Sequence, residues 1–275
     1  MRIPRAVLGG AGILACAFGW ITPELPVLAQ EAGTQTERIP VPPVPPRVAQ
    51  GQDYEHCLAM LSYDAAGANA FADAWEATGG GEGAMHCHGL AQIALGHGEI
   101  GAEMLEKLAG SSKAPSPARA SLYSQAVQAW LMADDPARAY GDATLALALS
   151  PDDADLLIDR SITAATMERY MDAIDDLNRA LKLDPQRADA WVFRAAAWRH
   201  ENRLDRAQQD IDRAIALSPE YPEALLERGI LRERRSDRAG ARADWQRVIA
   251  LAPGTPTADL AEQNLALLDA GPGRR

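Results

Sequence analysis

Four prolines recur at a constant interval, and this period constrains the fold more than any other feature of the sequence. Pro151, Pro185, Pro219 and Pro253 are spaced by 34 positions, and each ends a similar run of residues, in LALALSPDD, RALKLDPQR, RAIALSPEY and RVIALAPGT. A constant period of this length is typical of a helix–turn–helix unit that stacks on copies of itself. Because proline cannot continue a helix, each proline predicts the end of a unit's second helix. Residues 120–253 are therefore predicted to form four stacked helix pairs.

The composition agrees with a purely helical array. Hydrophobic residues make up 47% of the chain but aromatic residues only 5%, and alanine and leucine are abundant. Alanine and leucine are strong helix formers, whereas the residues that favour strands are scarce. No stretch after residue 50 alternates apolar and polar side chains for long. The expected fold class is all-α.

Small residues recur at fixed positions within each unit. They are Ser161, Ala195 and Gly229 in the first helices, and Ala139, Ala173, Ala207, Ala241, Ala146, Ala180 and Ala214 in the second helices, with Val248 in place of the last alanine. Small side chains let crossing helices approach, and larger neighbours fill the gap between units. This pattern resembles the tetratricopeptide-repeat (TPR) family. The resemblance implies a right-handed superhelical solenoid of antiparallel helix pairs.

The regions around the regular array are more irregular. Residues 51–110 are interpreted as diverged helical repeats, and residues 111–119 as a break before the four units. Residues 254–270 are predicted to form a capping helix, because a solenoid needs a polar outer face at its end. Residues 271–275 are expected to be a short disordered tail.

The N-terminus has the three parts of a secretory signal. Two arginines precede an apolar run, and small residues end the segment at Ala29, so residues 1–29 are the expected signal peptide. An apolar run of about 16 residues is short for a membrane span. The alternatives are a lipid attached to Cys16 and an uncleaved anchor, the latter being the one case in which a membrane contact is expected. Residues 30–50 are proline-rich and are predicted to be a disordered linker. The expected location is the periplasm or cell envelope.

The charge excludes some classes of partner. The net charge of −11 repels nucleic acid and anionic lipid, which need clustered cations. The sequence contains no glycine-rich phosphate loop after a strand, no serine nucleophile motif and no zinc-protease helix. We therefore expect neither catalysis nor a cofactor, metal or small-molecule substrate.

Six charged residues recur with the same period as the prolines. Each arginine lies on a predicted first helix, and an aspartate follows 16 positions later on the second helix. These residues, called the ladder below, are Arg160, Asp176, Arg194, Asp210, Arg228 and Asp244. Antiparallel helices bring such positions together, so the ladder is predicted to form ion pairs within each unit. Binding of a polyanion to the three arginines is the alternative.

Two cysteines remain after removal of the signal, Cys57 and Cys87. An even number of cysteines in an exported protein predicts a disulfide, which would close a loop of about 30 residues. An alternative is a metal- or redox-handling protein, because His56, His86, His88 and His97 lie nearby in the sequence. Adjacent residues on a helix point about 100° apart, which opposes convergence of these ligands on one ion.

The TPR resemblance also implies a binding surface. In TPR proteins the first helices line a concave surface, called the groove below, that receives an extended peptide or a partner's helix. The residues expected to line it are Asp155, Ile158, Asp159, Ile162, Asp189, Val192, Phe193, Arg199, His200, Glu223, Leu226, Glu227 and Ile230. The lysine and asparagine set that certain TPR domains use to clamp a terminal carboxylate is absent. The predicted function is a non-enzymatic scaffold for protein–protein interaction, with a partner that carries apolar anchors and some positive charge. An accessory subunit of an enzyme encoded elsewhere is a further possibility.

Overall fold

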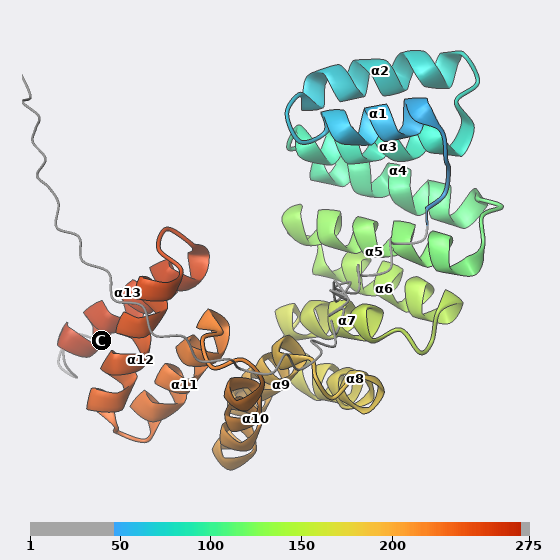
Figure 1. Ribbon diagram of the computed structural model, residues 1–275. Helices are drawn as coiled ribbons and strands as arrows, with labels where there is room; N and C mark the ends of the chain where they lie inside the picture. Colours follow the sequence, from blue (N-terminus) through green and yellow to red (C-terminus); the bar gives the residue numbers. More distant parts are fainter. Residues whose placement is uncertain (1–46, 271–275) are drawn as a thin grey trace, which may run out of the picture. The chain divides into compact units, whose positions relative to one another are not determined.

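A computed structural model describes residues 47–270 of the chain. The predicted signal peptide, the predicted tail and most of the predicted linker lie outside these residues. Residues 47–270 form thirteen α-helices and no strand (Figure 1). The helices are α1 (Gln52–Met60), α2 (Ala65–Ala77), α3 (Gly81–Ala94), α4 (Gly98–Ser111), α5 (Ser116–Met132), α6 (Pro136–Leu149), α7 (Ala154–Thr166), α8 (Tyr170–Leu183), α9 (Ala188–His200), α10 (Leu204–Leu217), α11 (Pro222–Arg234), α12 (Arg238–Leu251) and α13 (Pro256–Ala270).

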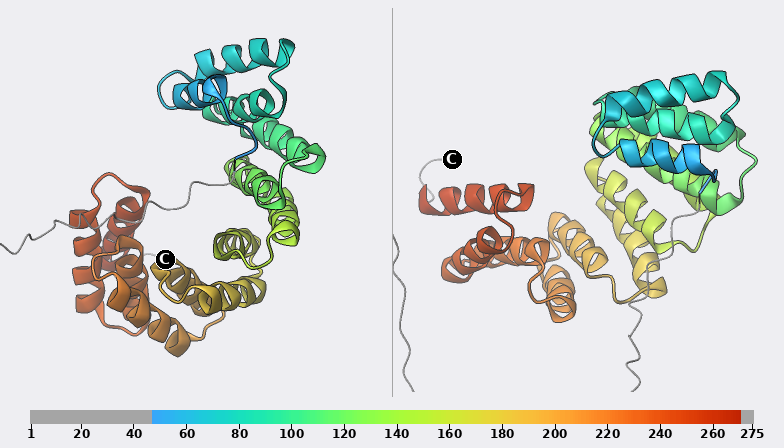
Figure 2. Two further views of the ribbon diagram at one scale, coloured as in Figure 1. Left: turned by 45° about the vertical axis from the view of Figure 1, so that its right-hand side comes forward. Right: turned by 45° about the horizontal axis from the view of Figure 1, so that its top comes forward.

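The helices stack in chain order. Each odd-numbered helix packs on the even-numbered helix that follows it, and each pair packs on the next from α1 and α2 onward. Odd-numbered helices also contact one another: α7 contacts α9, and α9 contacts α11. The odd-numbered helices therefore form one layer of the stack. Figures 1 and 2 show this succession from three directions. The predicted all-α solenoid of helix pairs is confirmed.

The period of 34 residues is visible in the ends of the second helices and in the turns within the pairs. The second helices end at Leu149, Leu183, Leu217 and Leu251, each two residues before a repeating proline. Within each of the four pairs from α5 to α12, one turn residue adopts a left-handed backbone conformation with φ between 55° and 67°. These four residues are also spaced by 34 positions: Asp134, Glu168, Asn202 and Ser236. None is glycine, so the surrounding packing must hold a conformation that L-residues seldom adopt.

The irregular N-terminal helices continue the array. Helix α4 packs against α5, although a short non-helical segment separates them in the sequence. At the other end, α13 packs on α12 and α11 and has no helix after it among the described residues. None of the helices in residues 47–270 combines the length and the apolar character that crossing a membrane requires.

Small residues at the helix crossings are buried, and Gly229 is the tightest case. A methyl group added there would lie 2.7 Å from Cδ1 of Trp245, a residue that is itself buried. The indole cannot move easily, because its Nε1 donates a hydrogen bond to the carbonyl of Leu226 at 3.2 Å. Gly229 therefore lets α11 and α12 approach each other.

Replacing Gly229 with alanine is expected to lower the free energy of unfolding by about 1–3 kcal/mol, because the methyl group overpacks the crossing. A matched control is Gly141→Ala on α6, where an added methyl group meets nothing within 4 Å. That change should raise the free energy of unfolding by about 0.5–1 kcal/mol, as in an ordinary exposed helix. Urea unfolding followed by circular dichroism measures both. Equal effects at the two positions would contradict the packing argument.

Candidate partner-binding groove

The layer of α7, α9 and α11 carries all of the residues predicted to line the groove. Three of these residues are not available to a partner, and for them the prediction is wrong. Ile158, Val192 and Glu227 are only 4%, 7% and 6% exposed. Ile158 and Val192 occupy the same position in successive units and pack into the apolar core, while Glu227 accepts a hydrogen bond from Arg199 at 2.5 Å. The other predicted lining residues are half-buried or exposed: Asp155, Asp159, Ile162, Asp189, Phe193, Arg199, His200, Glu223, Leu226 and Ile230.

A pocket of about 290 Å³ opens in this layer between α7, α8 and α9. Three of the predicted residues, Ile162, Phe193 and His200, line it. Residues that were not predicted to line the groove contribute as well, among them Tyr170 and Ala196. The Tyr170 and His200 rings are stacked, with centroids 4.3 Å apart. The pocket is therefore mainly apolar, with an aromatic pair on one wall.

The acidic end of the groove is partly neutralised. Asp155 and Asp189 both accept hydrogen bonds from Arg187. The distance between Arg187 Nη2 and Asp189 Oδ2 is 2.7 Å. Burial acts to raise the pKa of Asp189. The hydrogen bonds and the charge of Arg187 outweigh this effect, so the pKa of Asp189 is lowered. Asp159 forms no ion pair with an arginine within residues 47–270. Its carboxylate accepts from Ser124 Oγ at 2.7 Å and from Gln128 Nε2 at 3.1 Å, and burial raises its pKa. Arg187 therefore offsets part of the negative charge that the aspartates bring to the groove.

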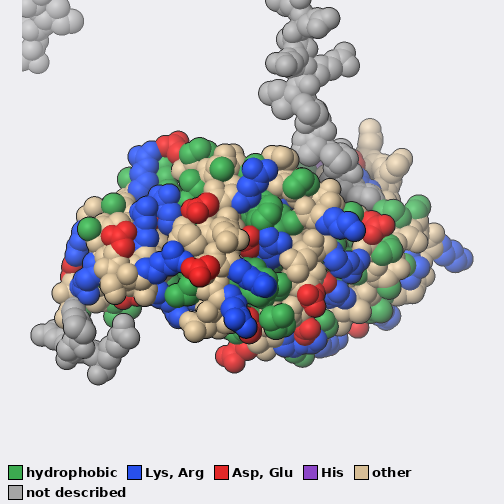
Figure 3. Space-filling model, turned by 90° about the horizontal axis from the view of Figure 1, so that it is seen from below, with side chains coloured by type: hydrophobic (Ala, Val, Ile, Leu, Met, Phe, Trp, Pro, Cys, Tyr) green, Lys and Arg blue, Asp and Glu red, His purple; other side chains and the backbone are tan. Residues whose placement is uncertain are grey.

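Residues 187–250 carry less negative charge than the part of the array before them. Burial lowers the pKa of His200, and the charges of Arg199 and Arg234 lower it further. The distribution along the chain shows the same trend. Residues 51–186 contain 8 basic and 21 acidic residues, whereas residues 187–250 contain 13 and 11. In Figure 3, Lys and Arg side chains are spread over the face in view, with acidic side chains between them.

The ladder residues meet as three separate pairs. Each arginine donates two hydrogen bonds to its aspartate, from Nε and Nη2 to the two carboxylate oxygens. The distances are 2.7 and 2.6 Å for Arg160 and Asp176, 2.8 and 2.8 Å for Arg194 and Asp210, and 2.9 and 2.6 Å for Arg228 and Asp244. All three aspartates are buried. The arginines are thus engaged within the fold, which argues against a polyanion site.

A fourth aspartate occupies the ladder position without an arginine. Asp142 stands one period before Asp176, but Ala126 stands one period before Arg160. The Asp142 side chain is 3% exposed and accepts a hydrogen bond from Trp130 Nε1 at 3.0 Å. Burial, reinforced by the charge of Glu106, raises its pKa to about 7. Asp142 was not predicted from the sequence, although the regular spacing of the aspartates contained the signal.

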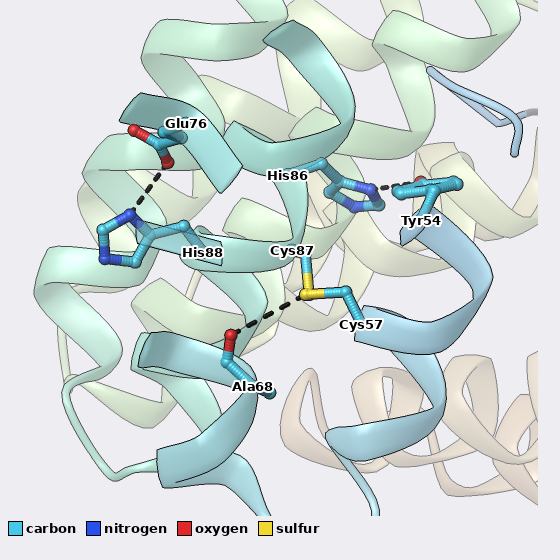
Figure 4. The surroundings of a disulfide bond; sticks show 7 residues. All are labelled: Tyr54, Cys57, Ala68, Glu76, His86, Cys87 and His88. Atoms are coloured by element: carbon cyan, nitrogen blue, oxygen red, sulfur yellow. Dashed lines mark hydrogen bonds and ion pairs between the residues drawn. A yellow bond between two sulfur atoms is a disulfide. The ribbon is translucent and has the colours of Figure 1, made fainter. Parts of the chain in front are cut away.

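Helices α1 and α3 are joined by a disulfide between Cys57 and Cys87, whose Sγ atoms are 1.98 Å apart (Figure 4). Both cysteines are buried. Nearby, His86 Nδ1 accepts from the Tyr54 hydroxyl at 2.5 Å, and its Nε2 donates to Gln125 Oε1 at 2.7 Å. Burial lowers the pKa of His86, which favours this neutral form.

The other histidines of the metal-handling alternative have separate surroundings. His88 lies 2.8 Å from a carboxylate oxygen of Glu76, and the ring of His56 packs edge-on against Phe71 (Figure 4 shows the first of these). His97 Nδ1 is hydrogen-bonded to Gln92 at 2.8 Å. In the part of the chain that the structure describes, no three His, Cys, Asp or Glu side chains are placed to hold a metal ion. The geometry gives no support to the metal-handling alternative.

Stacked helix pairs, a constant repeat length and small residues at the crossings define the class of α-helical solenoid repeat proteins. The family model described as tetratricopeptide repeat matches residues 158–222 and 201–259. Residues 158–259 of the chain are therefore tetratricopeptide repeats. No curated protein sequence matches it significantly.

Solved structures with a similar fold include other TPR proteins. YrrB is 18% identical, with 63% of this chain and 88% of YrrB covered and a TM-score of 0.52. MamA from Desulfovibrio magneticus RS-1, from residue 41 to its end, is 16% identical, with 76% and 99% covered and a TM-score of 0.52. A chain of the APC/C hetero-tetramer Cut9–Hcn1 is 15% identical, and the match covers 78% of this chain and 42% of that chain. Its TM-score is 0.57. At sequence identities this low, the structural similarity shows a shared fold and nothing more.

Proposed function

We propose that this protein is a non-enzymatic scaffold that binds a partner protein, as an extended peptide or a helix, in the groove. The observation that carries the proposal is the pocket of about 290 Å³ between α7, α8 and α9. It leaves apolar and aromatic surface open on the layer of first helices, where a solenoid offers an extended surface to partners. YrrB, which has a similar fold, is described as a TPR protein with an unusual peptide-binding site. The proposal extends peptide binding to this chain.

We further propose that the protein works in the periplasm or cell envelope. Residues 1–29 have the pattern of a cleavable secretory signal. A buried disulfide between Cys57 and Cys87 suits this location, because disulfides persist in oxidising compartments.

In-cell crosslinking tests the groove. A photo-reactive amino acid in place of Phe193, which lines the pocket, should capture a discrete partner protein on illumination. The matched control places the same amino acid at Ala216, an exposed position on α10 that does not line the pocket. Capture of the same proteins with equal yield at both positions would show that the groove is not the binding surface.

A further inference from the structure

The pocket arises from one small residue in a row of larger ones. Positions 162, 196 and 230 are equivalent positions on successive first helices, and they hold Ile162, Ala196 and Ile230. Both isoleucines are partly buried and pack against the apolar core beneath them. Ala196 interrupts this row on α9, and the pocket lies where the third isoleucine would stand. The hollow is therefore a feature of this sequence and not a property of every unit.

The size and walls of the pocket suit an amino-acid side chain. Its volume of about 290 Å³ is at the lower limit of about 300–1,000 Å³ for small-molecule sites. The floor is aliphatic, from Ile162 and Leu177, and Phe193 lies at its side. The stacked rings of Tyr170 and His200 complete the wall. Aromatic side chains bury large areas and pack well against other rings, so a bulky apolar or aromatic side chain is the occupant that this surface fits best.

Within residues 47–270, an arginine without an ion-pair partner occupies the next equivalent position on the layer of first helices. Arg234, the last residue of α11, occupies the position of His200 one unit further along. It is exposed and makes no hydrogen bond or ion pair of its own within residues 47–270. The neighbouring Arg199, in contrast, is paired with Glu227. Helices α9 and α11 pack against each other, so Arg234 lies on the same layer as the pocket residue His200. Arg234 can therefore pair with a carboxylate of a partner bound there.

We propose that the groove recognises a partner segment in which a bulky apolar or aromatic side chain enters the pocket at Ala196 and a nearby Asp or Glu pairs with Arg234. This inference rests on the proposed function and specifies the chemistry of the partner. It also revises the sequence-based expectation of a positively charged partner, because the acids Asp155 and Asp189 are already paired with Arg187.

A positional-scanning library of soluble ten-residue peptides, offered to the full chain, tests this proposal. One position of the bound peptides should be enriched in Phe, Trp, Leu, Ile or Met, with Asp or Glu enriched within a few residues of it. Fluorescence anisotropy then gives the Kd of the best peptide for three variants. Ala196→Ile fills the pocket and should weaken binding at least about tenfold. Ala216→Ile, the same change on the exposed face of α10, should leave the Kd within about twofold.

Arg234→Glu supplies a second and independent readout, because this exposed position tolerates substitution. It should weaken binding by about fivefold or more, and replacing the peptide's acidic residue with lysine should restore affinity. Binding that Ala196→Ile leaves unchanged, or a preference for basic flanks in the wild-type protein, would overturn the proposed partner chemistry and leave the groove function standing. Failure of every peptide to bind would overturn the proposed function itself.

Discussion

Replacing Arg194 with alanine is expected to lower the free energy of unfolding by about 3 kcal/mol, the scale found when one partner of a buried ion pair is removed. Asp210 is buried, and both of its carboxylate oxygens accept from Arg194 at 2.8 Å. Without the guanidinium, the carboxylate is left in a poorly solvated site with no counter-charge. Arg194 also donates to Asn178 Oδ1 at 2.8 Å and lies over the ring of Trp191, so packing is lost as well. Urea unfolding followed by circular dichroism measures the change. Hydrogen exchange should place it in α9 and α10.

The control for this experiment is Arg213→Ala on α10. Arg213 is exposed and makes no hydrogen bond or ion pair within the described part of the chain. Its removal should change the free energy of unfolding by less than about 0.5 kcal/mol. In the Arg194→Ala background, Asp210→Asn should recover part of the loss, because a neutral amide is easier to bury than an unpaired carboxylate. If Arg194→Ala and Arg213→Ala are equally mild, the ladder does not stabilise the solenoid.

The second large effect is expected at Asp142, the aspartate at the ladder position that lacks an arginine partner. Asp142→Asn should stabilise the protein at pH 8 by about 2–4 kcal/mol and have little effect near pH 4. Folding raises the pKa of Asp142 from an ordinary value of 3.8 to about 7, chiefly because the carboxyl group is buried. Between these values the folded protein holds a proton that the unfolded chain releases. Stability therefore falls as the pH rises through this window, and asparagine removes that loss because it stays neutral.

The groups around Asp142 act on its pKa in opposite directions. Glu106 on α4 adds a negative charge that favours protonation, while Trp130 on α5 and Arg138 on α6 favour the ionised form. Arg138 is already bound to Glu106 and Glu103, so its charge is shared. The pKa of Tyr123 is raised by burial and by the charge of Asp142.

The matched control is Asp176→Asn, the same change one unit further along. Asp176 has the arginine that Asp142 lacks, so its replacement should destabilise the protein at pH 8. Opposite signs for the two substitutions are the expected result. Urea unfolding at pH 5, 6, 7 and 8 measures each variant against the wild type. A difference between Asp142→Asn and the wild type that does not change with pH would contradict the buried-acid account.

The sequence by itself determined the repeating elements. The regularly spaced prolines placed the ends of α6, α8, α10 and α12, because proline blocks helix continuation through its own ring and missing N–H, whatever surrounds it. The constant spacing between ladder partners indicated which side chains could meet across an antiparallel pair. The pairing of Cys57 with Cys87 was also open to prediction, since they are the two cysteines after the predicted signal.

Only the tertiary structure decided which side of each helix remains open. Ile158 and Val192 have the same chemistry as the half-buried Ile162, yet they face the core, because small changes in rotation about the helix axis decide burial. The pairing of Arg187 with Asp155 and Asp189 joins α7 to the start of α9 and follows from how neighbouring units stack. The pocket at Ala196 likewise exists only when α7, α8 and α9 are packed together. Local periodicity specifies helices, whereas the surface offered to a partner depends on contacts between residues far apart in the sequence.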